Sequence, residues 1–350
     1  MIKEVSIVIH PEKEKDEKFI QKEICLALKK QGISFEEKDI STVFVKKSID
    51  ARHKNIKLFL RYKVYIGEKP ADENSLPEWK TTTGKKTVAI IGSGPAGLFG
   101  ALKLLEHGIK PVVIERGSET SKRKRDIAMI STTGIVDENS NYCFGEGGAG
   151  TFSDGKLYTR SNKRGNINGI LKIFTHFGAD KKILTDSHPH IGTDKLPAIV
   201  NNIRNFILQQ GGEFLFDTEC VDFILEKSED EKIVKGVVVK SHGEIKNIFA
   251  DAVLLATGHS ADSIYTLLAK LSPESLEAKT FAMGVRVEHP RNLIDSIQFH
   301  GQKNHELGAA EYRLTSQIDG RGVYSFCMCP GGFVVPSSTG PKEIVVNGMS

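Results

Sequence analysis

The sequence predicts an α/β protein in which a Rossmann-like dinucleotide-binding domain lies between a small N-terminal α+β domain and a strand-rich cap domain. Two observations carry this prediction. A G-x-G-x-x-G turn joins a β-branched run to a helical stretch near the end of the first quarter of the chain. After residue 85, strand-like and helix-like patterns alternate, whereas short strand-like runs dominate residues 263–350.

The small domain comprises residues 1–67. Residues 5–9 have a strand pattern, residues 13–30 have the pattern of a helix, and residues 43–49 and 56–66 indicate two further strands. The order strand, helix, strand, strand is typical of a small ferredoxin-like sandwich.

A polar stretch, residues 68–86, follows the small domain and contains Pro70, Pro77 and the only tryptophan of the chain, Trp79. Proline among polar residues is typical of a linker between domains. An arm laid across the surface of the next domain is the other interpretation, and the sequence leaves both open.

One strand of the small domain carries much positive charge. Between Lys46 and Lys63 there are seven Lys and Arg residues and one acid, Asp50. By the two-residue period of a strand, one face of the last strand presents Lys57, Phe59, Arg61, Lys63 and Tyr65. Basic residues interleaved with aromatic ones could bind single-stranded nucleic acid. We favour a solvated face, or a face that docks on an acidic partner domain, because no RNP-type motif is present.

The glycine-rich turn, Gly92-Ser-Gly-Pro-Ala-Gly97, lies between a predicted strand at residues 87–91 and a predicted helix at residues 98–107. Each glycine has a physical role in a dinucleotide fingerprint. Gly92 permits the tight turn, Gly94 lets the backbone approach a pyrophosphate, and Gly97 lets the helix lie close to the sheet.

Two further features support a dinucleotide site. Pro95 lies in the first helical turn, where its missing N–H costs nothing, and the free N–H groups of that turn can hold phosphates. The next apolar run, residues 111–114, ends at Glu115, which is placed to accept hydrogen bonds from a ribose. Strand, glycines, helix and acid in this order predict a dinucleotide-binding domain over residues 87–262, the alternative being a structural glycine-rich loop.

Residues 121–195 are predicted to be a segment inserted into this domain. It begins with the basic run Ser121-Lys-Arg-Lys-Arg125, which could guide a phosphate but more often marks an exposed helix start. A second glycine-rich stretch, residues 143–156, implies close approach of the backbone to a flat or charged group. Phe144 and Phe152 argue against a flexible loop there.

The remaining elements are mostly strands. A helix is predicted at residues 196–210, followed by strands at residues 213–225, 233–239 and 248–258. The cap domain, residues 263–350, is predicted to contain four strands, at residues 281–288, 310–314, 323–328 and 344–346. No Gly-Asp pair follows Gly258, so we expect that a C-terminal segment completing the cofactor domain is missing from this chain.

Composition limits the function only loosely. The net charge of +4 is too small to indicate a particular partner, and no apolar run approaches the length of a membrane span. The start of the chain has no signal-peptide pattern. The five cysteines are scattered, with no C-x-x-C pair and no Cys/His spacing typical of zinc. We therefore expect reduced thiols, a cytoplasmic location and no metal.

Five motifs carry a resemblance to a known family. They are Ile91-Gly-Ser-Gly-Pro-Ala-Gly97 with Ala101, Gly108 and Glu115, the stretch from Gly145 to Lys156, Ala256-Thr-Gly-His259, Gly284-Val-Arg-Val-Glu-His-Pro290 and Ser325-Phe-Cys-Met-Cys-Pro-Gly-Gly332. The chain resembles bacterial FAD-dependent dehydrogenases related to the glutathione-reductase-type flavoproteins, in particular a group with a small domain before the FAD domain. The resemblance implies a non-covalent FAD and an oxidoreductase, with no particular substrate.

The resemblance also implies a set of cofactor contacts. These are the pyrophosphate at Gly92, Gly94, Ala96 and Gly97, the adenosine ribose at Glu115, the flavin or its ribityl chain near Gly147, Gly148, Gly150 and Thr151, the adenine at the backbone of Val221, and a turn that closes over the cofactor at Thr257 and Gly258. Proline in the fingerprint and an acid at position 115 fit FAD and argue against NADPH at this first site.

Residues for proton transfer are harder to predict. Glu288 and His289 are the candidate catalytic residues, and His259, Lys156 and Asp154 are further candidates, although each histidine is more often structural.

Cys327 and Cys329 would share a strand face if residues 323–328 were extended, which suggests redox chemistry. A flavin disulfide reductase would normally show C-x-x-x-x-C near the first flavin segment, where Cys143 stands alone. Structural or incidental thiols are therefore favoured.

These features predict an FAD-dependent oxidoreductase, a dehydrogenase that uses its flavin for hydride transfer to or from a small-molecule substrate, with NAD(P)H as a possible transient reductant. The alternative is a flavin-binding protein associated with nucleic acid, of the tRNA-modification type, in which the basic small domain selects an RNA. We favour the first, so nucleic acid is not the expected partner.

Overall fold

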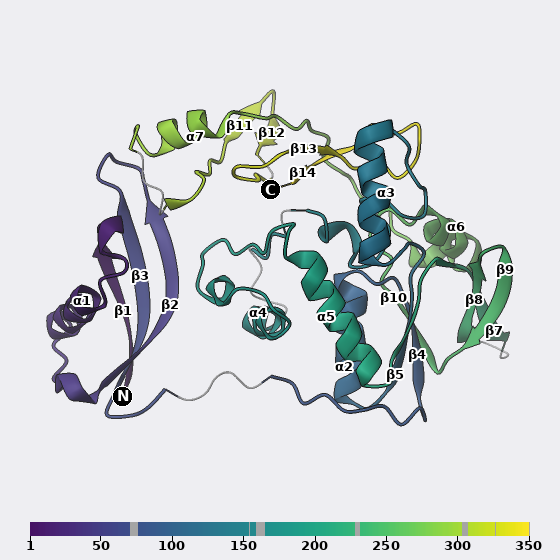
Figure 1. The fold of residues 1–350 in the computed structure, drawn as a ribbon, viewed down its shortest axis with the longest axis horizontal. Helices are drawn as coiled ribbons and strands as arrows, with labels where there is room; N and C mark the ends of the chain where they lie inside the picture. The colour runs from purple at the N-terminus through teal and green to yellow at the C-terminus, as the bar shows by residue number, and fades with distance from the viewer. Residues whose placement is uncertain are drawn as a thin grey trace.

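The computed structural model describes residues 1–70, 76–153, 155–158, 165–227, 232–302, 307–325 and 327–349. The small N-terminal domain lies at one end of the molecule and the dinucleotide-binding domain at the other, and the last part of the chain arches between them (Figure 1). The predicted class, an α/β protein with a Rossmann-like domain, a cap rich in strands and a small α+β domain, is confirmed.

The central sheet is parallel and has the order β10-β4-β5-β6. Its strands are β4 (Thr87–Ile91), β5 (Lys110–Ile114), β6 (Glu213–Leu215) and β10 (Ala252–Leu255). From β4 the chain moves outward through β5 to β6, and it returns on the other side of β4 as β10. Such a reversal leaves a crevice at the carboxyl ends of the two neighbouring strands, which is where open α/β sheets bind ligands.

Helices cover one face of this sheet: α2 (Pro95–Glu106), α5 (Leu196–Gln209) and α4 (Ile167–His176). Ile90 and Val113 point from the strands to this side and lie in one buried cluster with Leu102 and Ile203 of the helices. Each helix presents apolar residues at helical spacing, and their burial supplies most of the driving force for this layer.

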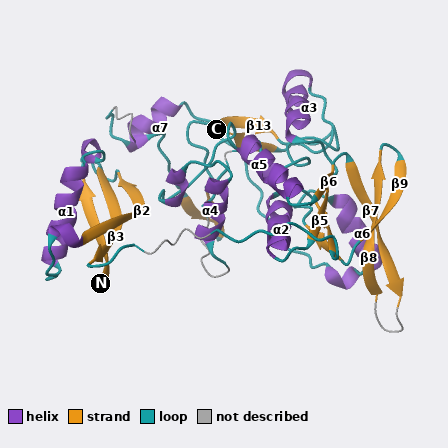
Figure 2. Cartoon of the chain, turned by 60° about the horizontal axis from the view of Figure 1, so that its bottom comes forward, coloured by secondary structure: helices purple, strands orange, loops and turns teal. Residues whose placement is uncertain are grey.

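The opposite face is covered by an antiparallel meander of β7 (Thr218–Lys227), β8 (Lys232–Ser241) and β9 (Glu244–Phe249), with α6 (Asp262–Leu271) beside it (Figures 1 and 2). Ala89 and Val112, which alternate with the residues of the helical side, pack here against Val237 and Ile264. Both faces of the central strands β4 and β5 are therefore buried, as their continuous apolar runs require, whereas the edge strand β10 leaves Leu254 and Leu255 38% and 39% exposed.

Two predicted strands are each two strands in the structure. Residues 213–225 divide into β6 and β7 at Asp217, whose φ of 49° turns the chain out of the parallel sheet. Residues 248–258 divide at Asp251 into β9 and β10. The apolar pattern runs through both breaks because each half is buried against the same cluster from a different sheet.

The inserted segment contains α3 (Thr120–Thr133), α4 and short 3-10 turns at Gly148–Gly150 and Lys181–Leu184. Among the described residues, no helix combines the length and apolar character needed to cross a membrane.

The small domain consists of β1 (Ile2–Ile9), α1 (Glu17–Lys30), β2 (Ile40–Asp50) and β3 (Lys57–Ile66), with 3-10 turns at Pro11–Lys13 and Glu37–Asp39. The sheet is antiparallel in the order β1-β3-β2, so β3 lies between β1 and β2 as in a split β-α-β unit. The Asp16 side chain caps α1 by accepting from Phe19 N at 3.0 Å. The small domain therefore has one strand and one helix fewer than a complete ferredoxin-like sandwich.

The basic face of β3 is less aromatic than the sequence suggested. Phe59 is 37% exposed, whereas Tyr65 is 3% exposed and is not available to a ligand. One aromatic side chain among Lys and Arg residues is a poor stacking platform, because single-strand binding relies on several stacked bases.

The last part of the chain completes the core of the small domain. Helix α7 (Arg291–Gln298) leads to Phe299, which is buried together with Leu307 and Ala310 in the cluster of Ile56 and Leu58. His300 Nε2 lies 2.8 Å from the carbonyl oxygen of Ala51. The sequence did not predict this contact between segments so far apart in the chain.

Edge strand β2 also touches the inserted segment. Lys47 N donates to the carbonyl oxygen of Thr185 at 3.0 Å, and the Ser187 hydroxyl donates to the carbonyl oxygen of Lys47. These two hydrogen bonds attach the small domain to the dinucleotide-binding domain in addition to the linker.

The cap contains two hairpins, β11 (Thr315–Ile318) with β12 (Arg321–Tyr324), and β13 (Phe333–Pro336) with β14 (Val346–Met349). A 3-10 turn, Pro273–Ser275, precedes them. The prediction of a strand at residues 281–288 is wrong, because this stretch pairs with no strand among the described residues. The predicted strand at residues 310–314 is not formed either, although the carbonyl oxygen of Leu314 accepts from Ser325 N at 2.9 Å, next to the β11–β12 hairpin. Alternating Phe281, Met283 and Val285 produced the strand pattern, yet their exposed fractions are 84%, 90% and 89%.

Residues 76–86 lie along the dinucleotide-binding domain as an arm. The Trp79 ring is 5.1 Å from the Phe206 ring and 5.9 Å from the Phe177 ring, centroid to centroid. Lys80 N donates to the carbonyl oxygen of Leu105, and Thr82 N to that of Gln210. Of the two interpretations of residues 68–86, a linker or an arm laid across the next domain, the arm therefore describes residues 76–86.

We expect Trp79→Ala to lower the free energy of unfolding by about 2–4 kcal/mol, since it removes a large aromatic contact surface. Trp79→Phe should cost less than about 1 kcal/mol, because it keeps ring contacts and removes an indole N–H that is buried without a hydrogen-bond partner among the described residues. Urea unfolding followed by circular dichroism compares the two. Equal decreases in unfolding free energy for the two variants would contradict the conclusion that the Trp79 ring packs against the dinucleotide-binding domain.

Candidate cofactor-binding site

A cavity of about 600 Å³ opens at the carboxyl ends of β4 and β10. This volume lies within the range of cofactor and small-molecule sites. The cavity lies at the crevice that the strand order predicts, and nine of the predicted cofactor residues line it: Gly92, Gly94, Pro95, Ala96, Glu115, Gly148, Gly150, Thr257 and Gly258.

The glycines of the fingerprint turn differ in what surrounds them. Gly92 has φ +107°, and a β-carbon built on it would lie 2.4 Å from the carbonyl oxygen of Ala256. A β-carbon on Gly97 would lie 1.9 Å from the carbonyl oxygen of Gly92. Side chains at these two positions would collide with backbone, so both glycines are required by the turn itself.

Gly94 is different because it faces the cavity. Its φ of −69° is open to any residue, and the nearest atom to a β-carbon there is Gly148 Cα at 3.7 Å. Its missing side chain therefore leaves space on the cavity side. Beyond it, the amides of Ala96 and Gly97 have no acceptor among the described residues, as expected in the first turn of a helix. A backbone cradle with free N–H groups at a helix N-terminus suits an anionic pyrophosphate.

The second glycine-rich stretch lies directly against the fingerprint turn. Gly147 N donates to the carbonyl oxygen of Ser93 at 3.0 Å, and Gly148 approaches Gly94 so closely that a β-carbon on Gly148 would lie 3.0 Å from Gly94 Cα. The cavity wall is therefore backbone from two segments about fifty residues apart in sequence. This explains why both stretches are rich in glycine.

Glu115 ties these segments together. Its Oε2 accepts from Ser93 N at 2.8 Å and from the Ser93 hydroxyl at 2.7 Å, and its Oε1 accepts from Gly117 N at 2.9 Å and Gly145 N at 3.0 Å. A carboxylate has about four lone-pair sites, so all are occupied. Glu115 lines the cavity, and its contact with a ribose stays a prediction, while the structure shows a positioning role that the sequence did not reveal.

Arg123 is the most important residue that sequence reasoning missed. Its side chain is completely buried and donates to four carbonyl oxygens, of Asn141, Tyr142, Gly145 and Glu146, at 2.7–3.2 Å. Burial lowers the pKa of its guanidinium to about 10, so it stays charged at neutral pH. Arg123 therefore holds the second glycine-rich stretch in shape from behind.

Arg123 could have been found in the sequence by its spacing. In α3 it stands four residues before Ile127 and seven before Ile130, and all three are buried. That spacing places it on the inward face of a helix, whereas its neighbours Lys124 and Arg125 are exposed.

A second buried charge lies at the start of α3. The Glu146 carboxylate is fully buried and accepts from Thr120 N at 2.7 Å, and Arg204 Nε lies 3.3 Å from its other oxygen. Burial raises the pKa of Glu146, against the opposing effect of the Thr120 amide and Arg204. Arg204 also pairs with Glu119 at 3.0 Å. One guanidinium of α5 therefore binds both the residue before α3 and the second glycine-rich stretch.

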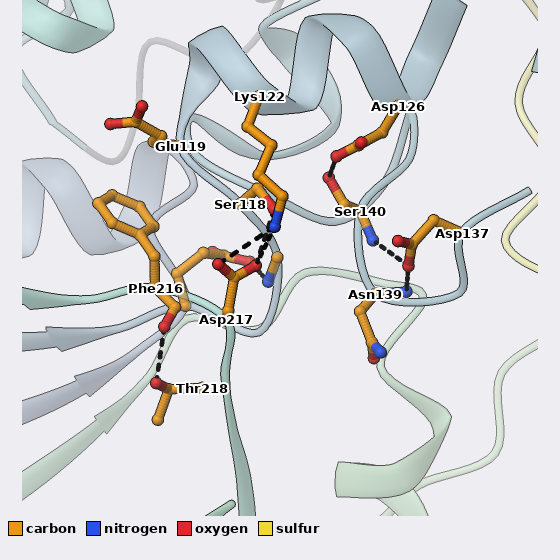
Figure 3. A network of polar contacts seen from close by, with 12 residues as sticks. Ser118, Glu119, Lys122, Asp126, Asp137, Asn139, Ser140, Phe216, Asp217 and Thr218 are labelled. Atoms are coloured by element: carbon orange, nitrogen blue, oxygen red, sulfur yellow. Dashed lines mark hydrogen bonds and ion pairs between the residues drawn. The ribbon is translucent and has the colours of Figure 1, made fainter. Parts of the chain in front are cut away.

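A polar network fastens the rim beside these charges (Figure 3). Ser118 Oγ donates to Asp217 Oδ1 at 2.7 Å, and Lys122 Nζ lies 3.3 Å from the same carboxylate. The Ser140 hydroxyl donates to Asp126. The bonds to Asp217 fix the loop after β5 and the start of α3 to the turn between β6 and β7, and the Ser140 bond fixes the loop after α3 to that helix.

The far wall combines β7 with α6. Glu219 and Cys220 line the cavity, and Val221 does not. The pairing of β7 with β8 skips Val221, which stands in a bulge and has no partner in that ladder. A backbone contact from Val221 to adenine stays a prediction, and the bulge leaves its amide and carbonyl out of the ladder.

Three other predicted cofactor residues do not line the cavity. Gly97, Gly147 and Thr151 lie behind the cavity wall, where the Thr151 hydroxyl donates to the carbonyl oxygen of Glu146 at 3.2 Å. Their role is to shape the two turns.

The structure does not bring the candidate catalytic pair to the cavity. Glu288 Oε2 accepts from Val334 N at 3.1 Å, and His289 Nε2 lies 2.8 Å from the Tyr312 hydroxyl. His259 does line the cavity, with its Nδ1 2.6 Å from the Ser260 hydroxyl. Lys156 is not among the lining residues, and Asp154 lies outside the described residues.

Three stretches of the chain match known protein families. Residues 85–134, which contain the fingerprint turn, Glu115 and Arg123, match an FAD binding domain. The chain carries an FAD-binding domain. Residues 280–350 match the C-terminal domain-like region of FAD-dependent proteins, and residues 1–65 match a domain of unknown function. The match over residues 85–134 supports the predicted FAD.

Similarity to individual proteins is partial. An uncharacterised protein of Clostridium beijerinckii is 40% identical over 351 residues, which is 95% of this chain and 63% of the relative. This chain thus spans less than two thirds of the length of that relative. THI4 of Thermovibrio ammonificans (17% identity, TM-score 0.35) is similar over 54% of this chain and 63% of its own. Glycerol-3-phosphate dehydrogenase of Bacillus halodurans (14% identity, TM-score 0.32) is similar over 53% and 37%.

Proposed function

We propose that this protein is an FAD-dependent oxidoreductase that binds its flavin non-covalently in the cavity beside β4 and β10. The observation that carries the proposal is the backbone cradle formed where Gly94 and Gly148 meet at the N-terminus of α2. Gly94 and the start of α2 lie inside the stretch that matches an FAD binding domain. When bound, FAD supplies hydride or single-electron transfer that no side chain can perform.

The residues of the cavity fit this cofactor. The free amides of the α2 N-terminus would donate to its phosphates, and Glu115 and Arg123 hold the two glycine-rich segments at the spacing that the cradle needs. Leu255, Ile264 and Leu268 supply an apolar wall for a flat ring.

His259 is the better of the two histidine candidates for moving a proton. It lines the cavity, and Ser260 fixes its ring through Nδ1, which leaves Nε2 for a substrate or a proton. His289 is engaged with Tyr312 outside the cavity.

The experiment that tests the proposal begins with the identity of the cofactor. Purified protein, denatured and chromatographed, should release FAD at up to one mole per mole of chain, and reconstitution with FAD should restore any that is lost. Anaerobic NADH, NADPH and a panel of small metabolites are then screened for bleaching of the flavin absorbance.

Two outcomes would contradict the proposal. Release of NAD without flavin would reject FAD as the cofactor. Bound FAD that no donor reduces, together with salt-sensitive RNA binding lost on reversing the charge of the β3 face, would favour the alternative protein associated with nucleic acid.

A further inference from the structure

Two cysteines of the cap each contact a positive charge. Lys156 Nζ donates to Cys329 Sγ at 3.1 Å, and Arg286 Nη1 donates to Cys327 Sγ at 3.3 Å. The two cations come from different segments, the second glycine-rich stretch and the extended stretch before α7. None of these four residues lines the cofactor cavity.

The two contacts belong to one cluster. A β-carbon built on Gly348 would lie 2.7 Å from Cys329 Sγ and also 3.3 Å from Arg286 Nη1, so the sulfur and the guanidinium border the same small space. Gly348 leaves that space open. Asn347 orients the guanidinium by accepting from Arg286 Nη2 at 2.7 Å. Two thiols and two cations are therefore grouped within a few ångströms of β14.

The other thiols of the chain have different surroundings. Cys25 and Cys220 are buried, and burial raises the pKa of both thiols, that of Cys220 to about 12. Cys143 is half-buried, and its sulfur lies 3.8 Å from the carbonyl oxygen of Ser337. Cys327 is exposed and Cys329 is half-buried, so reagents can reach the cap pair.

We propose that Cys327 and Cys329 form a nucleophilic thiol site that reacts with small anionic disulfides. A cation that donates to a sulfur stabilises the thiolate, which is the reactive form. The thiolate attacks one sulfur of the disulfide, a new S–S bond to the protein forms as the old one breaks, and the departing thiolate takes up the proton that the cysteine lost. The ammonium of Lys156 and the guanidinium of Arg286 attract the negative charge of the reagent.

The first test compares folded and urea-unfolded protein. Iodoacetamide labelling, resolved by mass spectrometry at each cysteine, should be at least about threefold faster for the cap pair in the folded protein than in the unfolded chain, because only the folded protein holds Lys156 and Arg286 against the two sulfurs. Exposure alone cannot exceed the unfolded rate. Cys25 and Cys220 should label more slowly in the folded protein. Cap thiols that label no faster folded than unfolded would overturn the proposal.

The second test addresses the charge of the reagent. For each reagent we compare the rate of reaction with the cap pair in the folded protein with the rate in the unfolded chain. This ratio should be larger for oxidised glutathione, which is anionic, than for cystamine, which is cationic. Lys156→Gln and Arg286→Gln should each reduce this preference and slow labelling of the contacted thiol, whereas Arg286→Lys should retain part of it. Arg313→Gln, elsewhere in the cap, is the control for net charge. Equal preference in all variants would reject Lys156 and Arg286 as the recognition groups.

Discussion

Gly94→Val should abolish the retention of FAD without unfolding the protein. The backbone at Gly94 has an ordinary extended conformation, and a β-carbon there meets only Gly148 Cα, at a normal contact distance. A valine is therefore tolerated by the protein, but its methyl groups occupy space where the pyrophosphate must approach the backbone. We expect affinity for FAD to fall by at least about 100-fold, or about 3 kcal/mol.

Gly97→Ala is the matched comparison in the same turn. Its β-carbon would lie 1.9 Å from a backbone oxygen, so the turn must move and the protein itself should lose about 1–3 kcal/mol of stability. Gly84→Ala, at a surface glycine with nothing near its added carbon, controls for the purification. Because the φ of Gly84 is +71°, the alanine variant is expected to lose some stability, but it should keep its flavin.

The measurement is flavin content per chain, together with thermal unfolding of the apoprotein. The Gly94 variant should lack FAD and melt as the wild-type apoprotein does. If it keeps full flavin, the cavity beside β4 is not the cofactor site. If it is as unstable as the Gly97 variant, the two glycines have the same structural role and the distinction drawn from their surroundings is wrong.

The sequence was most informative where chemistry fixes the spacing of residues. The fingerprint from Gly92 to Gly97 and the acid at Glu115 were placed correctly at the carboxyl ends of β4 and β5, because the turn, the helix start and the strand end are local structures. The second glycine-rich stretch lines the same cavity, and its contact with a flavin stays a prediction. Its glycines had no local explanation, and close approach to another group was the remaining physical reason.

The sequence was least informative where a residue acts through distant partners. Glu115 was expected to face only a ribose, and its four hydrogen bonds to loop amides and a hydroxyl depend on the fold. Glu146, a single acid among glycines, gave no signal that it would meet Arg204 of another helix. Pairwise contacts of this kind leave no periodic pattern in one sequence.

The cap shows the same limit for strands. Residues 281–288 alternate between apolar and other side chains, which is the pattern of a half-buried strand, but a strand forms only when another strand supplies its hydrogen bonds. Among the described residues, none pairs with this stretch. An alternating pattern thus indicates that a segment can form a strand, but whether it does depends on a neighbouring strand that pairs with it.

Arg123→Met is expected to have the largest effect on stability. The substitution keeps an apolar stem of similar length but leaves four buried carbonyl oxygens without their donor, and it removes a positive charge that acts on Glu115 and Glu146, of which Glu146 keeps Arg204 as its partner. Removing one partner of a buried charge network costs about 3–5 kcal/mol. Because the same carbonyls shape the second glycine-rich stretch, flavin content should fall as well.

Arg125→Met is the matched control, since it makes the same substitution in the same helix and in the same basic run of sequence. Arg125 is exposed, and its loss should change stability by no more than about 0.5 kcal/mol. Arg123→Lys keeps the charge but offers an ammonium where a planar fork reaches four acceptors, so it should fall between the two.

Urea unfolding and flavin titration of the three variants separate two explanations. If Arg123 acts through its directed hydrogen bonds, the lysine variant should recover only part of the stability and of the flavin. If charge alone matters, the lysine variant should behave as the wild type. If Arg123→Met is no less stable than Arg125→Met, the buried guanidinium is not needed to hold the second glycine-rich stretch, and the contacts of that stretch with Glu115, Ser93, Thr120 and Arg204 are sufficient to shape it.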